Sequence, residues 1–158
     1  MTDIEKLYRE KPLALFSIYT QVQADYLVKQ GNTLCDKLDG YDKDIVDFND
    51  TYGQFWLWVL GAYEVIRTLD QQSESFDPGF AKNLKEIKIF LAEVRMPFAK
   101  QEYRGNGGTI RGDLSVVGFE QDMKFEIAGN PVSSREVIIQ FTDFVESISL
   151  EQIDPSYA

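Results

Sequence analysis

One segment, residues 45–71, constrains the fold more than any other part of this chain. Large apolar residues recur in it at intervals of three and four: Phe48, Tyr52, Phe55, Val59, Tyr63 and Ile66. This spacing is typical of one face of an α-helix. A second stripe runs beside the first and consists of Gly53, Leu57, Leu60, Glu64 and Arg67. Because the two stripes together are mostly apolar, we expect both to be inside and this helix to lie at the centre of a bundle.

Two helices are predicted before this segment. A capping box, formed by Thr2 and Glu5, predicts a short helix over residues 3–10. A longer helix should follow over residues 12–38, because a proline at its start suits a first helical turn, although Gly31-Asn32 could bend or end it. Its apolar residues recur at helical spacing and predict its core face: Leu15, Ile18, Tyr19, Val22 and Tyr26.

A third long helix is predicted over residues 78–103. Asp77-Pro78 resembles an N-cap followed by a first-turn proline, and it comes after a polar connection. The apolar residues of this helix again recur at spacings of three and four: Phe80, Leu84, Ile87, Leu91, Val94 and Phe98. The connection from the second long helix is short, so we expect the two to be antiparallel neighbours.

The pattern changes after this helix. Residues 104–113 are rich in glycine and indicate a loop, while residues 114–119 and 123–127 indicate two strands of a hairpin that turns at 120–122. The second strand alternates strictly between apolar and charged residues, so one side of it should be buried. An isolated hairpin is only marginally stable in water, so its apolar face must pack on the helices or on another chain.

A last helix is predicted within residues 132–150, where Ser133 and Glu136 form a second capping box. Its apolar positions are Val137, Ile138, Phe141, Val145 and Ile148. The sequence therefore predicts a mainly α fold, an antiparallel bundle of three long helices with a β-hairpin and a C-terminal helix. At 158 residues we expect a single domain over 1–158, comprising the bundle (1–103), the loop and hairpin (104–131) and the last helix (132–150).

The chain has no histidine and only one cysteine, Cys35. Histidine is the commonest general base near neutral pH and the commonest ligand for transition metals. Its absence excludes nucleophile–imidazole catalysis and the zinc sites that use histidine, and one cysteine cannot build a thiolate site. A lone cysteine also excludes an internal disulfide. We therefore expect no metal site, no cofactor and no catalytic residues of these types.

A formal net charge of −10 narrows the expected partners. Such a charge repels phosphate backbones and anionic lipid at long range, so nucleic acid is an unlikely partner. The amino terminus is charged and lacks the apolar region of a signal peptide, and no apolar run reaches the 18 or so residues that cross a bilayer. These features favour a soluble, cytoplasmic protein that does not enter a membrane.

Two opposite charges, Glu64 and Arg67, interrupt the most apolar helix and mark a candidate site. The next long helix carries Arg95 close to Pro97, and a proline inside a helix frees a carbonyl and favours a bend. We therefore predict a polar cleft between these two helices. Its candidate residues are Tyr63, Glu64, Arg67, Arg95, Lys100 and Glu102. The alternative is structural, because long arginine and glutamate side chains reach water readily from a half-buried backbone.

The segment that begins at Arg95 resembles a motif of the HEPN group of small helical bundles. Ribonucleases of this group carry an arginine, four to six residues of any kind, and then a histidine. Here the histidine positions hold Lys100, Gln101 and Glu102. The resemblance covers residues 12–103, and it implies that Glu64 corresponds to a polar residue on the preceding helix. Loss of the histidine implies a relative without RNA-cleaving activity that serves as an interaction module.

The sequence as a whole favours a non-enzymatic interaction or regulatory module that self-associates. Four aromatic residues supply more apolar surface than one core stripe requires: Tyr52, Phe55, Trp56 and Trp58. The alternative is that the single chain covers all of them. Two other functions stay open, a HEPN-like ribonuclease or RNA-associated protein that uses Arg95, and a sensor that binds a small anion at Arg67 and Arg95.

Overall fold

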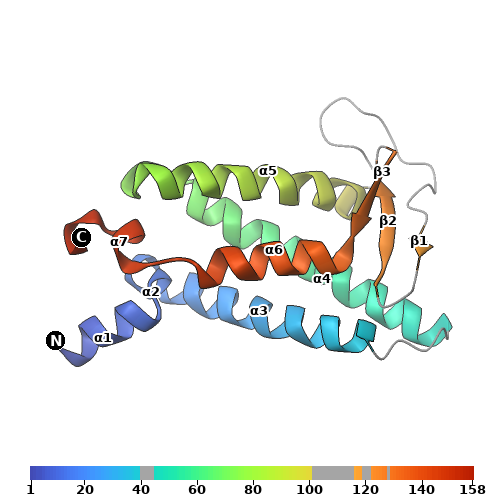
Figure 1. The fold of residues 1–158 in the computed structure, drawn as a ribbon, viewed down its shortest axis with the longest axis horizontal. Coiled ribbons are helices and arrows are strands. Elements are labelled where there is room, and N and C mark those ends of the chain that lie inside the picture. The colour runs from blue at the N-terminus through green and yellow to red at the C-terminus, as the bar shows by residue number, and fades with distance from the viewer. Residues whose placement is uncertain (40–44, 101–115, 119–121, 128) are drawn as a thin grey trace.

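A computed structural model describes residues 1–39, 45–100, 116–118, 122–127 and 129–158 of the chain. The described part is mainly α-helical, as the sequence predicts. Its long helices are α3 (Ile18–Asp39), α4 (Ile45–Asp70), α5 (Pro78–Lys100) and α6 (Ser134–Glu146). They lie alongside one another, with a small sheet at one end of the bundle and both termini at the other (Figure 1). The predicted glycine-rich loop at 104–113 and the turn at 120 and 121 lie outside the described residues.

Short elements complete the fold at the end of the bundle that holds the termini. Helices α1 (Asp3–Glu10) and α2 (Leu13–Phe16) precede α3, and α7 (Leu150–Ile153) with the 3-10 turn η2 (Pro155–Tyr157) follows α6. Another 3-10 turn, η1 (Ser73–Ser75), connects α4 to α5. Thr2 is confirmed as the N-cap of α1, because its hydroxyl accepts a hydrogen bond from the Glu5 amide at 3.2 Å. The structure differs from the predicted helix over 12–38 at Ser17, whose extended backbone separates α2 from α3.

Helix α4 is central to the bundle, and one stripe of it is buried. This stripe comprises Phe55, Trp58, Val59, Ala62, Val65, Ile66 and Leu69. The expectation that the second stripe is also inside is wrong, because Leu57 is 60% exposed and Glu64 is exposed as well. The neighbouring elements cover only one side of α4, so the apolar residues on its other side stay at the surface.

The aromatic residues of α4 connect three other elements. Trp58 donates its Nε1 hydrogen to the Leu27 carbonyl of α3 at 2.8 Å, and its ring meets Phe141 of α6 edge to face at 5.3 Å. Phe55 stacks on Phe125 of the sheet with 5.9 Å between the ring centres. Phe55 and Trp58 are therefore covered by the chain itself, and only Trp56 of the four aromatic residues that suggested self-association is exposed, at 38%.

The apolar residues of helix α3 predicted one core face, but a different face of the helix packs against the core. Its buried positions are Thr20, Gln21, Ala24, Leu27, Gly31, Leu34 and Leu38. The predicted core face is wrong, because Ile18, Tyr19, Val22 and Tyr26 are all exposed. Small residues on the buried face of α3 explain why this face, and not the more apolar one, packs against the core. A Cβ atom at Gly31 would lie 2.7 Å from Ile138 of α6 and 3.3 Å from the Trp58 ring nitrogen, so neighbouring helices approach the α3 backbone closely there.

The sheet comprises β1 (Val116–Gly118), β2 (Lys124–Ile127) and β3 (Asn130–Ser133), antiparallel in the order β1-β2-β3. Alternation in the second predicted strand is confirmed, since Phe125 and Ile127 are buried while Lys124 and Glu126 are exposed. The third strand was not predicted, because Asn130-Pro131 resembles a turn. It pairs with β2 in the register Phe125 to Val132, and Gly129 precedes it at a φ of 80°, which favours glycine.

The close approach at Gly31 predicts opposite effects for two glycine-to-alanine substitutions. Gly31→Ala should lower the free energy of unfolding by about 1–3 kcal/mol, because the new methyl group overpacks the contact with Ile138. Gly53→Ala, in α4, meets nothing within 4 Å and should raise it by up to about 1 kcal/mol through helix propensity. Urea denaturation of both variants measures the difference. Equal stabilisation by the two would contradict this packing.

Candidate interaction surface

The described residues of the predicted polar cleft form two separate pairs. On the surface of α4, Arg67 pairs with Glu64 at 2.8 Å, and the two side chains are 39% and 49% exposed. The hydrogen bond that Arg67 donates to Glu64 also raises the pKa of the Arg67 guanidinium. On α5, the guanidinium carbon of Arg95 lies 4.6 Å from the centre of the Tyr63 ring. Among the described residues, no hydrogen bond or ion pair joins Arg95 to Glu64 or Arg67.

The geometry favours the structural interpretation of the charges within the apolar helix. Glu64 and Arg67 neutralise each other where α4 meets solvent, and an exposed pair of this kind contributes little to stability. Arg95 is held by a cation–π contact, with its guanidinium also 3.7 Å from the Met96 sulfur. The Lys100 side chain and the whole of Glu102 lie outside the part of the chain that the structure describes.

A different surface stands out once the fold is known. We call it the α3–α4 face, and it consists of large apolar residues that are mostly exposed: Tyr19 (82%), Ile18 (68%), Val22 (60%), Leu57 (60%) and Tyr26 (59%). The four residues of α3 follow one another at helical spacing, so they form one stripe along the helix. Tyr26 and Leu57 both line two grooves between α3 and α4, of about 290 and 340 Å³, which joins the stripe to α4.

The α3–α4 face carries little charge. Of the residues that line its two grooves, only Glu64 is charged, and Arg67 pairs with it. The polar residues among them are the amides Gln23, Gln30 and Gln54. An apolar, nearly neutral face on a chain with a net charge of −10 is typical of a surface that contacts another protein. The sequence showed these apolar residues, but helical spacing alone assigned those of α3 to the core.

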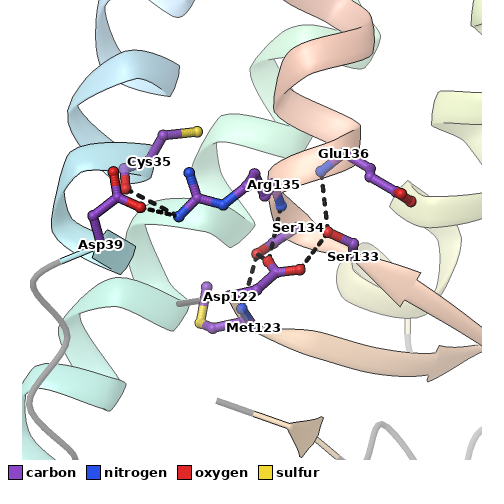
Figure 2. A network of polar contacts seen from close by, with 8 residues as sticks. All are labelled: Cys35, Asp39, Asp122, Met123, Ser133, Ser134, Arg135 and Glu136. Atoms are coloured by element: carbon purple, nitrogen blue, oxygen red, sulfur yellow. Dashed lines mark hydrogen bonds and ion pairs between the residues drawn. The ribbon is translucent and has the colours of Figure 1, made fainter. Parts of the chain in front are cut away.

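A polar network at the other end of α3 has a structural role (Figure 2). Asp122 is buried just before β2 and accepts hydrogen bonds from the Ser133 hydroxyl, from the Ser134 hydroxyl at 2.8 Å and from the Arg135 amide at 3.1 Å. The Ser133 hydroxyl in turn accepts from the Glu136 amide at 3.1 Å, which confirms Ser133 as the N-cap of α6. Asp122 therefore fixes the start of α6 to the sheet.

Arg135 extends this network to α3. Its guanidinium donates to Asp39 at 2.7 Å and to the Cys35 carbonyl at 3.4 Å, which satisfies groups at the C-terminal end of that helix. The network offers no activated nucleophile. Both serine hydroxyls donate to Asp122, and burial raises the pKa of the Cys35 thiol, which disfavours the reactive thiolate.

No protein-family model matches this chain, and neither a curated protein nor a solved structure matches it. The resemblance to the HEPN group therefore stays a prediction. Within the described residues, no three or more side chains of the metal-ligating types converge on one point. No described helix has the length and the apolar character needed to cross a bilayer.

The Asp122 network predicts that a nearly isosteric substitution is costly. Asp122→Asn replaces one acceptor oxygen by an amide that cannot accept from the serine hydroxyls, so the free energy of unfolding should fall by about 1–3 kcal/mol. Asp143→Asn, at an exposed position of α6, is the matched control and should change it by less than about 0.5 kcal/mol. Urea denaturation followed by circular dichroism compares them. Similar effects of the two substitutions would remove the role assigned to Asp122.

Proposed function

We propose that this protein is a non-enzymatic interaction module that self-associates through the α3–α4 face. The observation that carries the proposal is the exposure of Ile18, Tyr19, Val22, Tyr26 and Leu57 on adjacent helices. Contiguous apolar surface of this kind is favourable to remove from water, at about 25 cal/mol per Å². The interaction module is thus built on the helix face that sequence periodicity assigned to the core.

The low charge of the α3–α4 face is compatible with a second copy as the occupant. Two molecules that each carry −10 repel one another, so they associate best through a face where charge is low. The α3–α4 face meets this condition, since Glu64 and Arg67 neutralise each other at its edge. In a two-fold dimer the same patch is used by both subunits, so a single neutral, self-complementary face is enough.

The side chains of the face also suit an interface. Tyr19 and Tyr26 combine large apolar rings with a hydroxyl group, and tyrosine is enriched among the residues that contribute most to binding. Leu57 and Tyr26 border the two grooves between α3 and α4, so side chains of a partner can insert there. The amides of Gln23, Gln30 and Gln54 provide hydrogen-bonding groups around this apolar centre.

The alternative functions receive less support from the described geometry. Arg95 lies against the Tyr63 ring and Arg67 is paired with Glu64, so neither guanidinium is held ready for an incoming anion or a phosphate backbone. The ribonuclease and the anion sensor therefore remain predictions that rest on the sequence. No observation in the described structure favours either of them over self-association.

Val22→Glu tests the proposal. In a two-fold dimer this substitution places a charge in the interface twice, so it should weaken dimerisation roughly 100-fold or more. Light scattering coupled to size-exclusion chromatography, at tens of micromolar protein, should show a dimer for the unmodified chain and a monomer for the variant. Raising the salt concentration should strengthen dimerisation of the unmodified chain, because salt screens the repulsion between the two acidic molecules.

Ile139→Glu is the matched control. Ile139 is an exposed aliphatic residue of α6 and does not belong to the α3–α4 face, so its substitution should leave the dimer intact. An unmodified chain that is monomeric at these concentrations would falsify the proposal. Equal dissociation by the two variants would also count against it, because the effect would then come from added charge and not from the face.

A further inference from the structure

Helix α1 is attached to the bundle by surface contacts alone. The structure describes all of its eight residues, and none of them is buried. Its apolar residues Ile4 and Leu7 are 63% and 50% exposed. Of the described apolar residues that pack against the core, none belongs to α1. In Figure 1 the helix lies at the edge of the molecule, beyond the start of α3. Burial of apolar side chains therefore does not hold α1 in place.

One ion pair connects α1 to a distant part of the chain. The Arg9 guanidinium, in the last turn of α1, donates to Glu151 of α7 at 3.0 Å. Among the described residues, no other hydrogen bond or ion pair runs from α1 to another helix, because the second ion pair of Arg9, with Glu5 at 3.6 Å, lies within α1. The side chains of Arg9 and Glu151 are 42% and 38% exposed. A pair this exposed is screened by salt and contributes little to stability.

Glu151 is the fixed half of this ion pair. It lies in α7, whose residues Leu150 and Ile153 are buried, so the packing of α7 does not depend on α1. Hydrogen bonds from its own backbone amide, from the Ser149 side chain and from Arg9 hold the pKa of the Glu151 carboxyl below its usual value. The carboxylate is therefore charged at neutral pH and stays on the bundle when α1 moves.

A short connection separates α1 from the firmly packed part of the chain. It consists of Lys11, whose backbone is not helical at a φ of −136° and a ψ of 69°, and Pro12. The Lys11 ammonium group pairs with Asp25 of α3 at 2.9 Å. Leu13, the first residue of α2, is 1% exposed and belongs to the core. The chain is therefore anchored from Lys11 onward, so a change of backbone conformation near this residue is enough to move α1.

The energetics of α1 favour opening over unfolding of the whole chain. Isolated helices shorter than about 12–15 residues are only marginally stable in water, so α1 should lose its helical structure once Arg9 leaves Glu151. This opening breaks one exposed ion pair and a short run of helical hydrogen bonds. Unfolding of the bundle also exposes the buried core, which is far more costly. Local opening of α1 therefore requires much less free energy than global unfolding.

We infer that α1 is a lid that opens without unfolding of the bundle, and that the Arg9–Glu151 ion pair is the contact that closes it. Arg9 and Glu10, at the end of α1, form one wall of a cleft of about 650 Å³. The other walls come from α3, from the C-terminal end of α6 and from the residues after it. Opening of α1 removes the first wall, and salt favours the open form because it screens the ion pair. The lid shares no residue with the α3–α4 face, so it does not depend on self-association.

Amide hydrogen exchange of the full chain, followed residue by residue with NMR, tests the lid. In low salt, the hydrogen-bonded amides of α1 should exchange at least about 100-fold faster than those of the buried residues Val59 and Ile66 in α4. Low concentrations of urea should not speed exchange in α1, because a local opening exposes little surface, whereas exchange in the core should follow global unfolding. Amides of α1 that exchange as slowly as those of the core, with the same dependence on urea, would overturn the inference.

Glu151→Gln tests the ion pair itself. It removes the charge and keeps the size of the side chain, so amides of α1 should exchange about two- to fivefold faster, as expected for loss of an exposed ion pair, while those of α4 stay unchanged. Sodium chloride at about 1 M should have a similar effect on the unmodified chain and a smaller one on the variant. Glu74→Gln, at an exposed position of η1, is the matched control and should leave exchange in α1 unchanged. Equal exchange in α1 of the unmodified chain and Glu151→Gln would remove the role assigned to the pair.

Discussion

The arrangement of the long helices depends on the contact of Trp58 with α3. An indole N–H that is buried without a partner is costly, and here it donates to the Leu27 carbonyl at 2.8 Å. The same ring meets Phe141 of α6, while Phe55, stacked on it, reaches Phe125 of the sheet. One hydrogen bond and its aromatic neighbours therefore fix α3, α4, α6 and the sheet relative to each other. The crossing is close because Gly61 of α4 lets the Leu27 side chain approach.

This crossing decides which way the other faces of α3 point. Once Ala24, Leu27 and Gly31 are turned inward, Ile18, Val22 and Tyr26 must point outward, because a helix cannot bury both sets against the same neighbours. The proposed α3–α4 face is thus a consequence of how one helix is rotated about its axis.

The polar network around Asp122 holds the opposite end of the molecule together. It ties the sheet to the start of α6 and, through Arg135, to the end of α3. The hydroxyl, amide and carboxylate groups of this network form hydrogen bonds with one another, so the network stabilises the fold and offers no reactive group. The proposed interaction surface lies elsewhere, on exposed apolar side chains that the fold leaves uncovered.

The sequence by itself determined most of the long helices and the N-caps of α1 and α6. Apolar spacing located α4, α5 and α6, and the short-range hydrogen bonds of Thr2 and Ser133 occur where the capping boxes predicted them. Such signals depend on residues within a few positions of one another, so they can be recognised in the sequence alone. The alternation that marked β2 is local in the same sense.

Only the tertiary structure decided which face of each helix is buried and which groups meet. Periodicity shows that Val22 and Tyr26 share a side of α3, but not that small residues such as Gly31 make the other side the better packing surface. Residues Asn130–Ser133 form a strand because they pair with β2, although the dipeptide Asn130-Pro131 resembles a turn in the sequence. These features depend on long-range contacts, whose energies exceed the preference of any one segment.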